Sequence, residues 1–174
     1  MKKIEVHCAY DEMVDIIKLV PNPRNPNQHS DRQIELLAKI IEHQGWRAPI
    51  TVSKRSGFVV RGHGRLLAAE ALGLDEVPVD YQDYANEAEE WADLIADNRL
   101  AELSELDNEM LRDLIQEIDS EEIDLTLTGY DEDALESLLT PIDIDDFFKD
   151  HEEPTNEKEG EVKVCPHCGR TIEE

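Results

Sequence analysis

The stretch V59-V-R-G-H-G-R-L-L-A-A-E-A-L-G73 predicts a short apolar strand that passes through two glycines into a helix. Gly62 and Gly64 allow the backbone to approach a ligand closely, and a helix start offers unpaired N–H groups and partial positive charge. Arg65, on the first helical turn, is unfavourable there unless a negative group lies nearby. The motif therefore favours a phosphate bound by Gly62, His63, Gly64 and Arg65, and a ligand-free strand-to-helix turn is the alternative.

Helix and strand signals surround this motif. A helix capped by Ser30, with apolar residues at the helical period, should end at Gly45. The remaining predicted elements are an extended segment at 16–20, a hairpin of strands 49–53 and 58–60, a helix at about 65–72, and a strand at 77–81. Pro78 favours a sheet edge or a strand start for the last of these. This order predicts an α+β domain with a small mixed sheet and flanking helices.

The second half of the chain predicts helices at 85–99, 107–118 and 131–139. The first of these has an apolar face, with Ala88, Trp91, Ala92 and Ile95 at the helical period. The predicted organisation is a domain at 1–104, an acidic helical extension at 105–148, a flexible linker at 149–161 and a tail at 162–174 with the Cys-x-x-Cys pattern.

The formal net charge of −25 is unevenly distributed. Residues 22–65 hold eight basic and three acidic residues, whereas residues 66–174 hold six basic and 35 acidic ones. The overall charge argues against a general nucleic-acid coat and against binding to anionic membranes, so direct DNA contact would have to use the basic 22–65 region. Neither a signal peptide nor a run of about 20 apolar residues is found, and we expect a cytoplasmic protein.

Two groups of residues have metal-ligand chemistry. Asp97, Asn98 and Glu102 offer oxygen ligands at a helix end, which suit Mg²⁺ shared with substrate phosphates, although a helix cap is the alternative reading. Cys165 and Cys168 have the spacing of a zinc knuckle. The other Zn²⁺ ligands would have to come from His167, His151, Cys8, His7 or a second subunit, and a solvated tail without metal is the alternative.

Several motifs in order resemble the ParB/sulfiredoxin superfamily, whose members include the ParB-like nuclease domains. They are N22-P23, the capped helix, G45-W-R-A-P-I-T-V52, V60-R-G-H-G-R-L-L-A-A-E-A-L-G-L-D-E-V-P-V79 and A96-D-N-R-L-A-E-L103. The match spans about residues 14–104. Together with L125-T-L-T-G-Y-D-E-D-A-L-E-S-L-L139, it looks like the branch of phages and mobile elements that accompanies DNA methyltransferases.

The resemblance implies a nucleotide pocket, because chromosome-partitioning ParB proteins bind CTP with Mg²⁺ and hydrolyse it, while other branches use ATP or ADP. Gly62 and Arg65 match the two ends of the family's phosphate motif, and Asp97 with Asn98 match its metal and phosphate motif. The further nucleotide contacts expected are Asn22, Pro23, His63, Gly64 and Arg99. Two family arginines are replaced, by Gly64 and Ala101, and this weakens the case for CTP in particular.

The expected function is therefore nucleotide binding, with Mg²⁺ and with NTP hydrolysis as an open question, in phage or mobile-element DNA metabolism. His63 would be the base and Asp97 the catalytic carboxylate. One alternative is a Mg²⁺-dependent DNA nuclease using Asp97, Glu102 and Glu70. Another is a non-catalytic adaptor whose acidic helices and tail bind a DNA methyltransferase, a packaging protein or another DNA-processing partner. A homodimer is also among the expected assemblies of the chain.

Two activities of the superfamily are not expected. The position of the nucleophilic cysteine of sulfiredoxin is His63 here, which argues against sulfinic acid reduction. The helices that begin near 107 and 131 are acidic, so a helix-turn-helix unit and operator binding like that of partitioning ParB are not expected.

Overall fold

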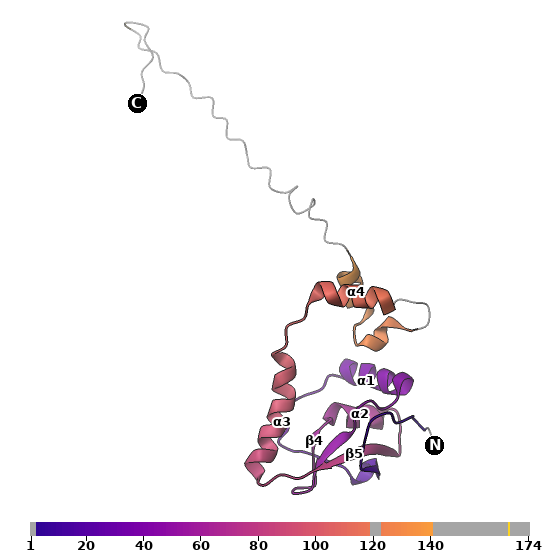
Figure 1. Cartoon of the computed structure of the whole chain (residues 1–174), viewed down its shortest axis with the longest axis vertical. Coiled ribbons are helices and arrows are strands. Elements are labelled where there is room, and N and C mark those ends of the chain that lie inside the picture. Colours follow the sequence, from indigo (N-terminus) through magenta and orange to yellow (C-terminus); the bar gives the residue numbers. More distant parts are fainter. Residues whose placement is uncertain (1–2, 119–122, 141–166, 168–174) are drawn as a thin grey trace. The chain divides into compact units, whose positions relative to one another are not determined.

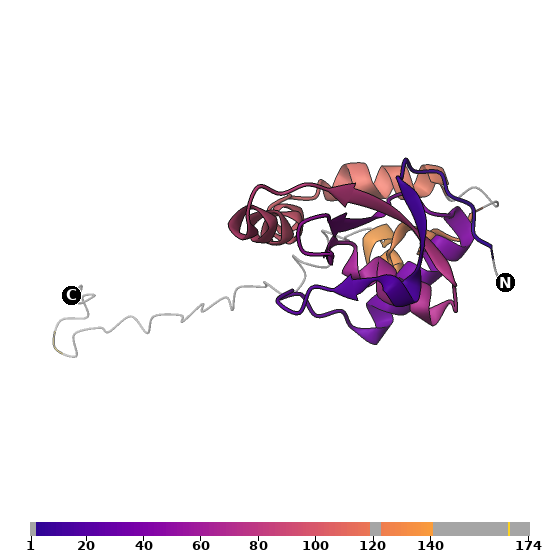
Figure 2. The ribbon, with the colours of Figure 1, turned by 90° about the horizontal axis from the view of Figure 1, so that it is seen from below.

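A curled five-stranded sheet forms the centre of the domain in the computed structural model, which describes residues 3–118, 123–140 and 167 (Figure 2). Two strand pairs, β3 with β5 and β2 with β4, are parallel, and the other two pairs are antiparallel. The expected α+β class with a small mixed sheet is thereby confirmed. In spatial order the strands are β1 (Glu12–Asp15), β5 (Glu76–Gln82), β3 (Ile50–Ser53), β4 (Phe58–Arg61) and β2 (Val20–Pro21).

The predicted β3–β4 hairpin is present, but the extended segment predicted at 16–20 is wrong in its details. Strand β1 ends at Asp15, and a 3₁₀ turn, η1 (Ile16–Lys18), separates it from β2. The Asp15 carboxylate accepts a hydrogen bond from the Ile17 backbone N–H at 3.1 Å. This side-chain cap stabilises a turn in a segment whose β-branched residues favour a strand.

Strand β5 is an inner strand of the sheet, which corrects the prediction of an edge strand, whereas Pro78 does lie near the start of β5. Strand β5 has β1 on one side and β3 on the other, and Pro78 pairs with Met13 of β1. The pairing with β3 begins only at Val79. Pro78 therefore precedes the part of β5 that has strand neighbours on both sides, and its missing N–H costs the sheet little.

Helices α1 (Asp31–Gln44) and α2 (His63–Ala71) pack against each other, and α2 lies between α1 and the sheet (Figure 1). The Ser30 hydroxyl caps α1 as predicted, accepting from the Gln33 N–H at 3.2 Å. Helix α2 starts two residues earlier than predicted, at His63. The core joins these helices to the sheet through Val14, Ala38, Ile41, Trp46, Ile50, Val52, Val59, Leu66, Ala68, Ala69, Leu74, Val77 and Val79.

Helix α3 (Glu87–Glu102) packs beside strand β4, but with a different face from the one predicted. Ala88 and Ala92 are exposed, and Ile95 is 56% exposed. Glu90 and Leu94 are buried instead, with exposed fractions of 1% and 3%. The apolar periodicity was misleading here because the inward face of α3 is built largely from carboxylates that meet arginines and serines of the sheet.

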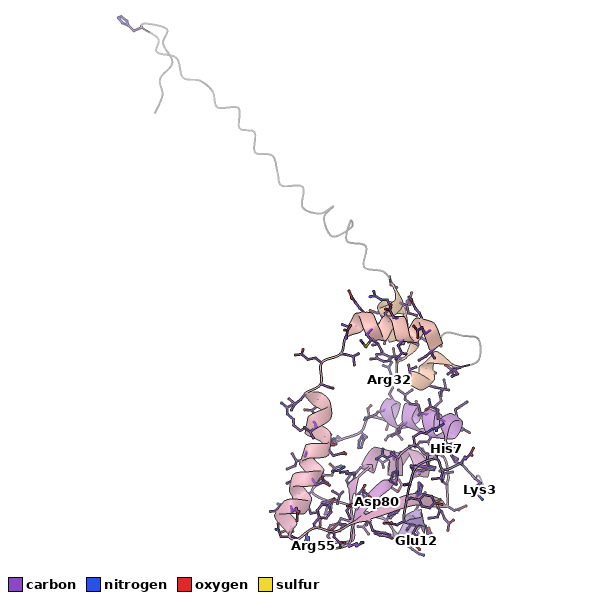
Figure 3. The ribbon with its side chains drawn as sticks, viewed as in Figure 1. Lys3, His7, Glu12, Arg32, Arg55 and Asp80 are labelled. Atoms are coloured by element: carbon purple, nitrogen blue, oxygen red, sulfur yellow. The ribbon has the colours of Figure 1, made fainter. Side chains whose placement is uncertain are left out.

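A second helical group follows, formed by α4 (Asn108–Ile118), the 3₁₀ turn η2 (Leu125–Thr128) and α5 (Glu132–Leu139). Ile115 and Leu135 are its buried apolar residues. Ion pairs of Lys39 with Asp124 and of Arg32 with Asp131 join this group to α1, and Figure 3 shows Arg32 at the side of α1 that faces the group. No helix among residues 3–118 and 123–140 is long and apolar enough to span a membrane.

Candidate functional site

A pocket of about 200 Å³ lies at the start of α2, where the glycine motif was expected to bind an anion. It is formed where the loop before α1, the end of β4, the first turn of α2 and the last turns of α3 meet. Segments far apart in sequence thus contribute to one small polar hollow. Its lining residues are Asn25, His29, Leu37, Val60, Arg61, Gly62, His63, Gly64, Arg65, Asp97 and Asn98.

The backbone at the mouth of the pocket requires glycine at two positions. Gly62 has φ = +87°, a left-handed conformation that side chains disfavour, and a Cβ there would lie 3.1 Å from Nε and Nη2 of Arg65. A Cβ on Gly64 would lie 3.2 Å from the His29 ring and 3.4 Å from Leu37. Gly62 therefore leaves room for the Arg65 side chain, and Gly64 lets α2 approach α1 closely.

Arg65 is the most informative residue of the pocket. Its Nε is buried and lacks a hydrogen-bond partner, and the same is true of Asn22 Nδ2. Burial is the main cause that lowers the pKa of the Arg65 guanidinium, whereas Asp97 and Cys8 act in the opposite direction. A buried donor without a partner costs about 1–3 kcal/mol, and more when it is charged. An anion in the pocket would remove this cost.

The other basic residues of the 22–65 region are mostly neutralised within the chain. Five of the eight pair with a carboxylate from residues 83–131: Arg32 with Asp131, Lys39 with Asp124, Lys54 with Asp83, Arg55 with Glu90, and Arg61 with Asp93. Arg24 lies over the Trp91 ring, 4.3 Å from its centre. Over the described ranges Arg65 forms no ion pair within 4.0 Å, so its positive charge is available to a ligand.

His63 joins the pocket to the loop that precedes α1. Its Nε2 accepts a hydrogen bond from the Asn22 backbone N–H at 3.3 Å. The Asn22 side chain is buried and accepts from the Arg24 N–H at 3.0 Å. Burial, followed by the neighbouring His29, lowers the pKa of His63, and Asp97 opposes this shift. The ring is therefore neutral at pH 7, with its proton on Nδ1.

Arg61 is held at the edge of the pocket by α3. Its guanidinium forms an ion pair with Asp93, whose Oδ2 also accepts from the Tyr84 hydroxyl at 2.7 Å. Burial alone would raise the pKa of Asp93, but the hydrogen bonds from Arg61 and Tyr84 lower it. Burial and the contact with Asp93 raise the pKa of Tyr84. Asp97 lies farther away, 3.8 Å from Arg61 Nε, and its carboxylate remains 41% exposed.

The three expected Mg²⁺ ligands are only partly brought together. Asp97 and Asn98 both line the pocket, and Asn98 donates its side-chain N–H to Leu94 O at 3.0 Å, which leaves Oδ1 to act as an acceptor. Glu102 does not line the pocket and accepts from Arg99 at 2.7 Å. Between residues 3 and 118 and between 123 and 140, no three His, Cys, Asp or Glu side chains gather closely enough to form a metal site on their own.

Other predicted site residues lie outside this hollow. Pro23 and Arg99 are exposed and do not line it, and neither does Glu70, a carboxylate considered for a nuclease. Cys165 and Cys168 fall outside the described residues, as does His151, while His167 is described as an exposed turn residue. The predicted linker at 149–161 also falls outside them.

Asn25, His29, Leu37, Val60 and Arg61 line the pocket but were not named as site residues from the sequence. His29 and Arg61 are polar residues directly beside motifs that the sequence analysis identified. Their position next to these motifs could have marked them as candidate site residues. His29 Nδ1 lies 3.1 Å from Gln33 Oε1, which places the ring at the start of α1.

Larger hollows exist, but they lack an unpaired buried donor. One of about 1110 Å³ lies beside β1 and the N-terminal segment, and one of about 420 Å³ lies between α1 and the second helical group. Arg32 and Lys39 line the latter, and both pair with carboxylates. In the described part of the chain, the buried side-chain atoms without a partner are Asn22 Nδ2 and Arg65 Nε.

Family models match two parts of the chain. The ParB N-terminal domain matches residues 3–98, which is more than half of the chain, and the ParB-methyltransferase HTH domain matches residues 109–166. The second match overturns the expectation that no helix-turn-helix unit follows the core. That expectation was based on acidic charge, but charge is a property of the helix surface, and a helix-turn-helix fold requires only the packing of its helices.

One curated relative and two solved structures are also similar to this chain. The ParB-like nuclease domain-containing protein YnaK of Escherichia coli (strain K12) is 39% identical over 62 residues, which cover 36% of this chain and 70% of YnaK. A C-terminally truncated chromosome-partitioning protein ParB from Caulobacter crescentus, solved with CTP-γ-S, has a TM-score of 0.61 at 19% identity and covers 83% of this chain and 87% of its own. The same protein solved with the centromeric parS site has a TM-score of 0.44 at 17% identity, and the match covers 79% of this chain and 76% of that one.

Proposed function

The chain belongs to the ParB N-terminal domain family, and on that premise we propose that the pocket at the start of α2 binds the phosphate groups of a nucleotide. The similar fold of a ParB solved with CTP-γ-S supports a nucleoside triphosphate such as CTP or ATP as the ligand. The match to the ParB-methyltransferase HTH domain supports a role in DNA metabolism together with a DNA methyltransferase. We further propose that this role belongs to a phage or mobile element and is carried out in the cytoplasm.

The observation that carries this proposal is the Nε atom of Arg65, which is buried and has no hydrogen-bond partner. A guanidinium with a fixed fork of donors binds two phosphate oxygens at once, and the first turn of α2 adds N–H groups beside it. The left-handed Gly62 keeps the space in front of Arg65 open. Asn22 Nδ2 is a second buried donor without a protein partner, but Asn22 does not line the pocket and contacts it through the hydrogen bond from its N–H to His63 Nε2.

Mg²⁺ would be held by Asp97 and by Oδ1 of Asn98, since one or two protein oxygens combined with substrate phosphates and water form the usual environment of this ion. The ion would neutralise phosphate charge and bring the nucleotide closer to the Asp97 carboxylate. Glu102, paired with Arg99, is not needed in this arrangement.

His63 fits a hydrogen-bond donor better than the general base expected from the sequence. Its Nε2 lone pair accepts from the Asn22 N–H, so Nδ1 carries the proton. A base at this position would first have to give up that hydrogen bond. We therefore assign His63 to phosphate binding and leave Asp97 as the carboxylate that would orient water if the nucleotide is hydrolysed.

The nuclease alternative receives less support from the geometry. Two-metal nucleases collect several carboxylates around their ions, whereas Asp97 is the one carboxylate among the pocket-lining residues that the structure describes. Glu70 and Glu102, the other two acids considered, lie outside the pocket lining. A nucleotide with a single Mg²⁺ suits this site better.

Titration calorimetry with CTP, ATP, GTP and ADP, with and without Mg²⁺, tests the proposal. We expect one nucleotide to bind the full chain, more tightly with Mg²⁺, and Arg65→Ala to weaken binding by about 10- to 150-fold, which corresponds to the loss of a charge-assisted contact of about 1.5–3 kcal/mol. Loss of the buried unpaired donor should leave the folded state at least as stable as before.

Arg47→Ala is the matched control, because Arg47 is an exposed arginine that does not line the pocket. It changes the net charge by the same amount and should leave affinity unchanged. If both variants weaken binding equally, the effect of Arg65 on nucleotide affinity is due to long-range electrostatics and not to a direct contact. If millimolar nucleotide fails to bind the wild-type chain, the proposal is wrong for these ligands.

A further inference from the structure

Five exposed apolar side chains lie along the chain from the end of α3 into α4, and none of them lines the pocket. They are Leu100, Leu103, Leu106, Met110 and Leu114, which we call the apolar ridge, and their exposed fractions lie between 51% and 69%. Single exposed apolar residues are ordinary, but five within fifteen positions are not. Figure 1 shows the chain passing directly from α3 to α4.

Helix α4 shows why the ridge remains exposed. Ile115 is buried, and Leu111 and Ile118 are half-buried on the same side of the helix. Met110 and Leu114, one turn apart, extend the apolar surface beyond that packed side. The apolar arc of α4 is thus wider than its neighbours cover, as is typical of a helix with a second packing surface.

The charges around the ridge are strongly one-sided. Residues 99–117 contain six acidic residues, Glu102, Glu105, Asp107, Glu109, Asp113 and Glu117, and two arginines. Both arginines are already engaged, because Arg99 pairs with Glu102 and Arg112 Nε donates to Leu138 O at 2.8 Å. A partner therefore meets apolar side chains with a negative border.

The negative charge of this border disfavours three other occupants of the apolar ridge. A second copy would place the same acidic border against itself, because a two-fold interface pairs a surface with its own duplicate. Duplex DNA presents phosphates, which the acids repel. The apolar segment I142-D-I-D-D-F-F148 of this chain carries three aspartates within seven residues and is repelled in the same way.

We propose that the apolar ridge binds a basic amphipathic helix of a partner protein. Apolar residues at i, i+3, i+4 and i+7 of that helix would cover the ridge, and its Lys and Arg residues would meet the acidic border. Such a docking surface lies outside the nucleotide pocket, because none of the ridge residues lines it. Nucleotide binding and partner binding can thus be tested separately.

A synthetic helix is the probe, with leucines at the stated spacing, lysines at the remaining positions and a length of about five turns. A second peptide carries glutamates in place of the lysines. Fluorescence anisotropy with the full chain should show binding of the lysine peptide and none of the glutamate peptide. The double variant Met110→Ser with Leu114→Ser should bind the lysine peptide at least about tenfold more weakly.

Ile17→Ser is the matched apolar control, because Ile17 is 87% exposed on η1, away from the ridge, and its loss should leave the affinity unchanged. Circular dichroism should show the same helix content in all variants, since the replaced side chains are exposed. Equal loss in the Ile17 and ridge variants, or equal binding of both peptides, would overturn the proposal.

Two other outcomes would also overturn it. A dimer in sedimentation that dissociates in the Met110 and Leu114 variant would assign the ridge to a second copy. Duplex DNA that binds the wild-type chain and displaces the lysine peptide, but does not bind the ridge variant, would assign it to nucleic acid.

Discussion

Gly62 is subject to two constraints that a single residue rarely combines. Its φ of +87° belongs to the left-handed region, and a Cβ would touch the Arg65 guanidinium at 3.1 Å. Gly57, in the turn between β3 and β4, has a similar φ of +76° but open space around it. Comparing the two separates the cost of the backbone conformation from the cost of moving Arg65.

We expect Gly62→Ala and Gly57→Ala to destabilise the fold by similar amounts, about 1–2 kcal/mol, because both force a side chain into the left-handed region. Only Gly62→Ala should weaken nucleotide binding, by about tenfold, since only there does the new methyl group displace Arg65. Urea unfolding and calorimetry measure the two effects. Similar affinities of the two variants would show that Arg65 does not need the space in front of Gly62.

His63 should make stability depend on pH in the mildly acidic range. Burial lowers its pKa from the ordinary value of 6.5, so the unfolded chain takes up the proton first as pH falls. The stability that neutral His63 contributes is complete above pH 6.5 and is lost as pH falls toward the lower pKa of the folded state. His29 and Asp97 are the titratable neighbours that modify this shift.

Urea unfolding at about pH 7.5 and about pH 5.5 checks this expectation. The free energy of unfolding should fall between these values in the wild-type chain and fall less in His63→Gln. His29→Gln serves as the control, because it removes the neighbouring imidazole ring and leaves His63 in place. An unchanged pH dependence in His63→Gln would contradict the assignment of a neutral, buried His63.

At the scale of elements, α3 is the helix that attaches the acidic half of the chain to the sheet. Glu90 is 1% exposed and accepts hydrogen bonds from Ser53 Oγ at 2.6 Å, Ser56 Oγ at 2.8 Å and Arg55 Nε at 3.1 Å. One helical turn later, Asp93 holds Arg61. These carboxylates fix the rotation of α3 and so bring Asp97 and Asn98 to the pocket.

Replacing Glu90 should therefore cost more than replacing an exposed glutamate. Glu90→Ala removes the buried acceptor of Arg55 Nε and of two hydroxyl groups, and we expect a loss of about 1–3 kcal/mol in the free energy of unfolding. Glu87→Ala, on an exposed position of the same helix, should cost less than about 1 kcal/mol. Denaturant titration measures both, and equal losses would contradict a structural role of the Glu90 cluster.

At the scale of the whole described molecule, the uneven charge of the sequence is resolved by pairing between its two halves. Carboxylates from residues 83–131 neutralise five of the eight basic residues in the 22–65 region. The basic region is thus less available to DNA than its composition indicates. Two of these pairs, at Arg32 and Lys39, join α1 to the second helical group.

Removing one such pair should loosen the second helical group without unfolding the domain. Lys39 Nζ lies 2.6 Å from Asp124 Oδ2 and also donates to Thr126 Oγ1, both on or beside η2. Lys39→Met should cost about 0.2–1 kcal/mol and speed hydrogen exchange in α4 and α5 a few-fold. Lys54→Met removes a similar exposed pair with Asp83 and should leave exchange in these helices unchanged.

Unchanged protection of α4 and α5 in Lys39→Met would show that the Lys39 ion pair is not needed to hold the group on α1, where the Arg32–Asp131 pair remains. The same exchange experiment on the double variant Lys39→Met with Asp124→Asn gives the coupling between the two side chains. Because the hydrogen bond from Lys39 is the main cause that lowers the pKa of Asp124, a detectable coupling is expected at neutral pH.

The sequence by itself determined the features that depend on neighbours along the chain. The Ser30 cap, the β3–β4 hairpin and the glycine turn into α2 each need residues only a few positions apart, and all three were predicted. The position of Arg65 on the first turn of α2 also followed from local pattern. Family motifs then identified Asp97 and Asn98, which the structure places in the same pocket.

Only the tertiary structure decided which charges meet and which remain unpaired. Arg61 and Asp93 are 32 positions apart, and Lys39 and Asp124 are 85 apart, so no local pattern links them. The inward face of α3 was missed because carboxylates become buried only where distant partners compensate their charge. Arg65 is a candidate ligand-binding group for a related reason, because only the folded chain shows that its Nε is buried without a hydrogen-bond partner.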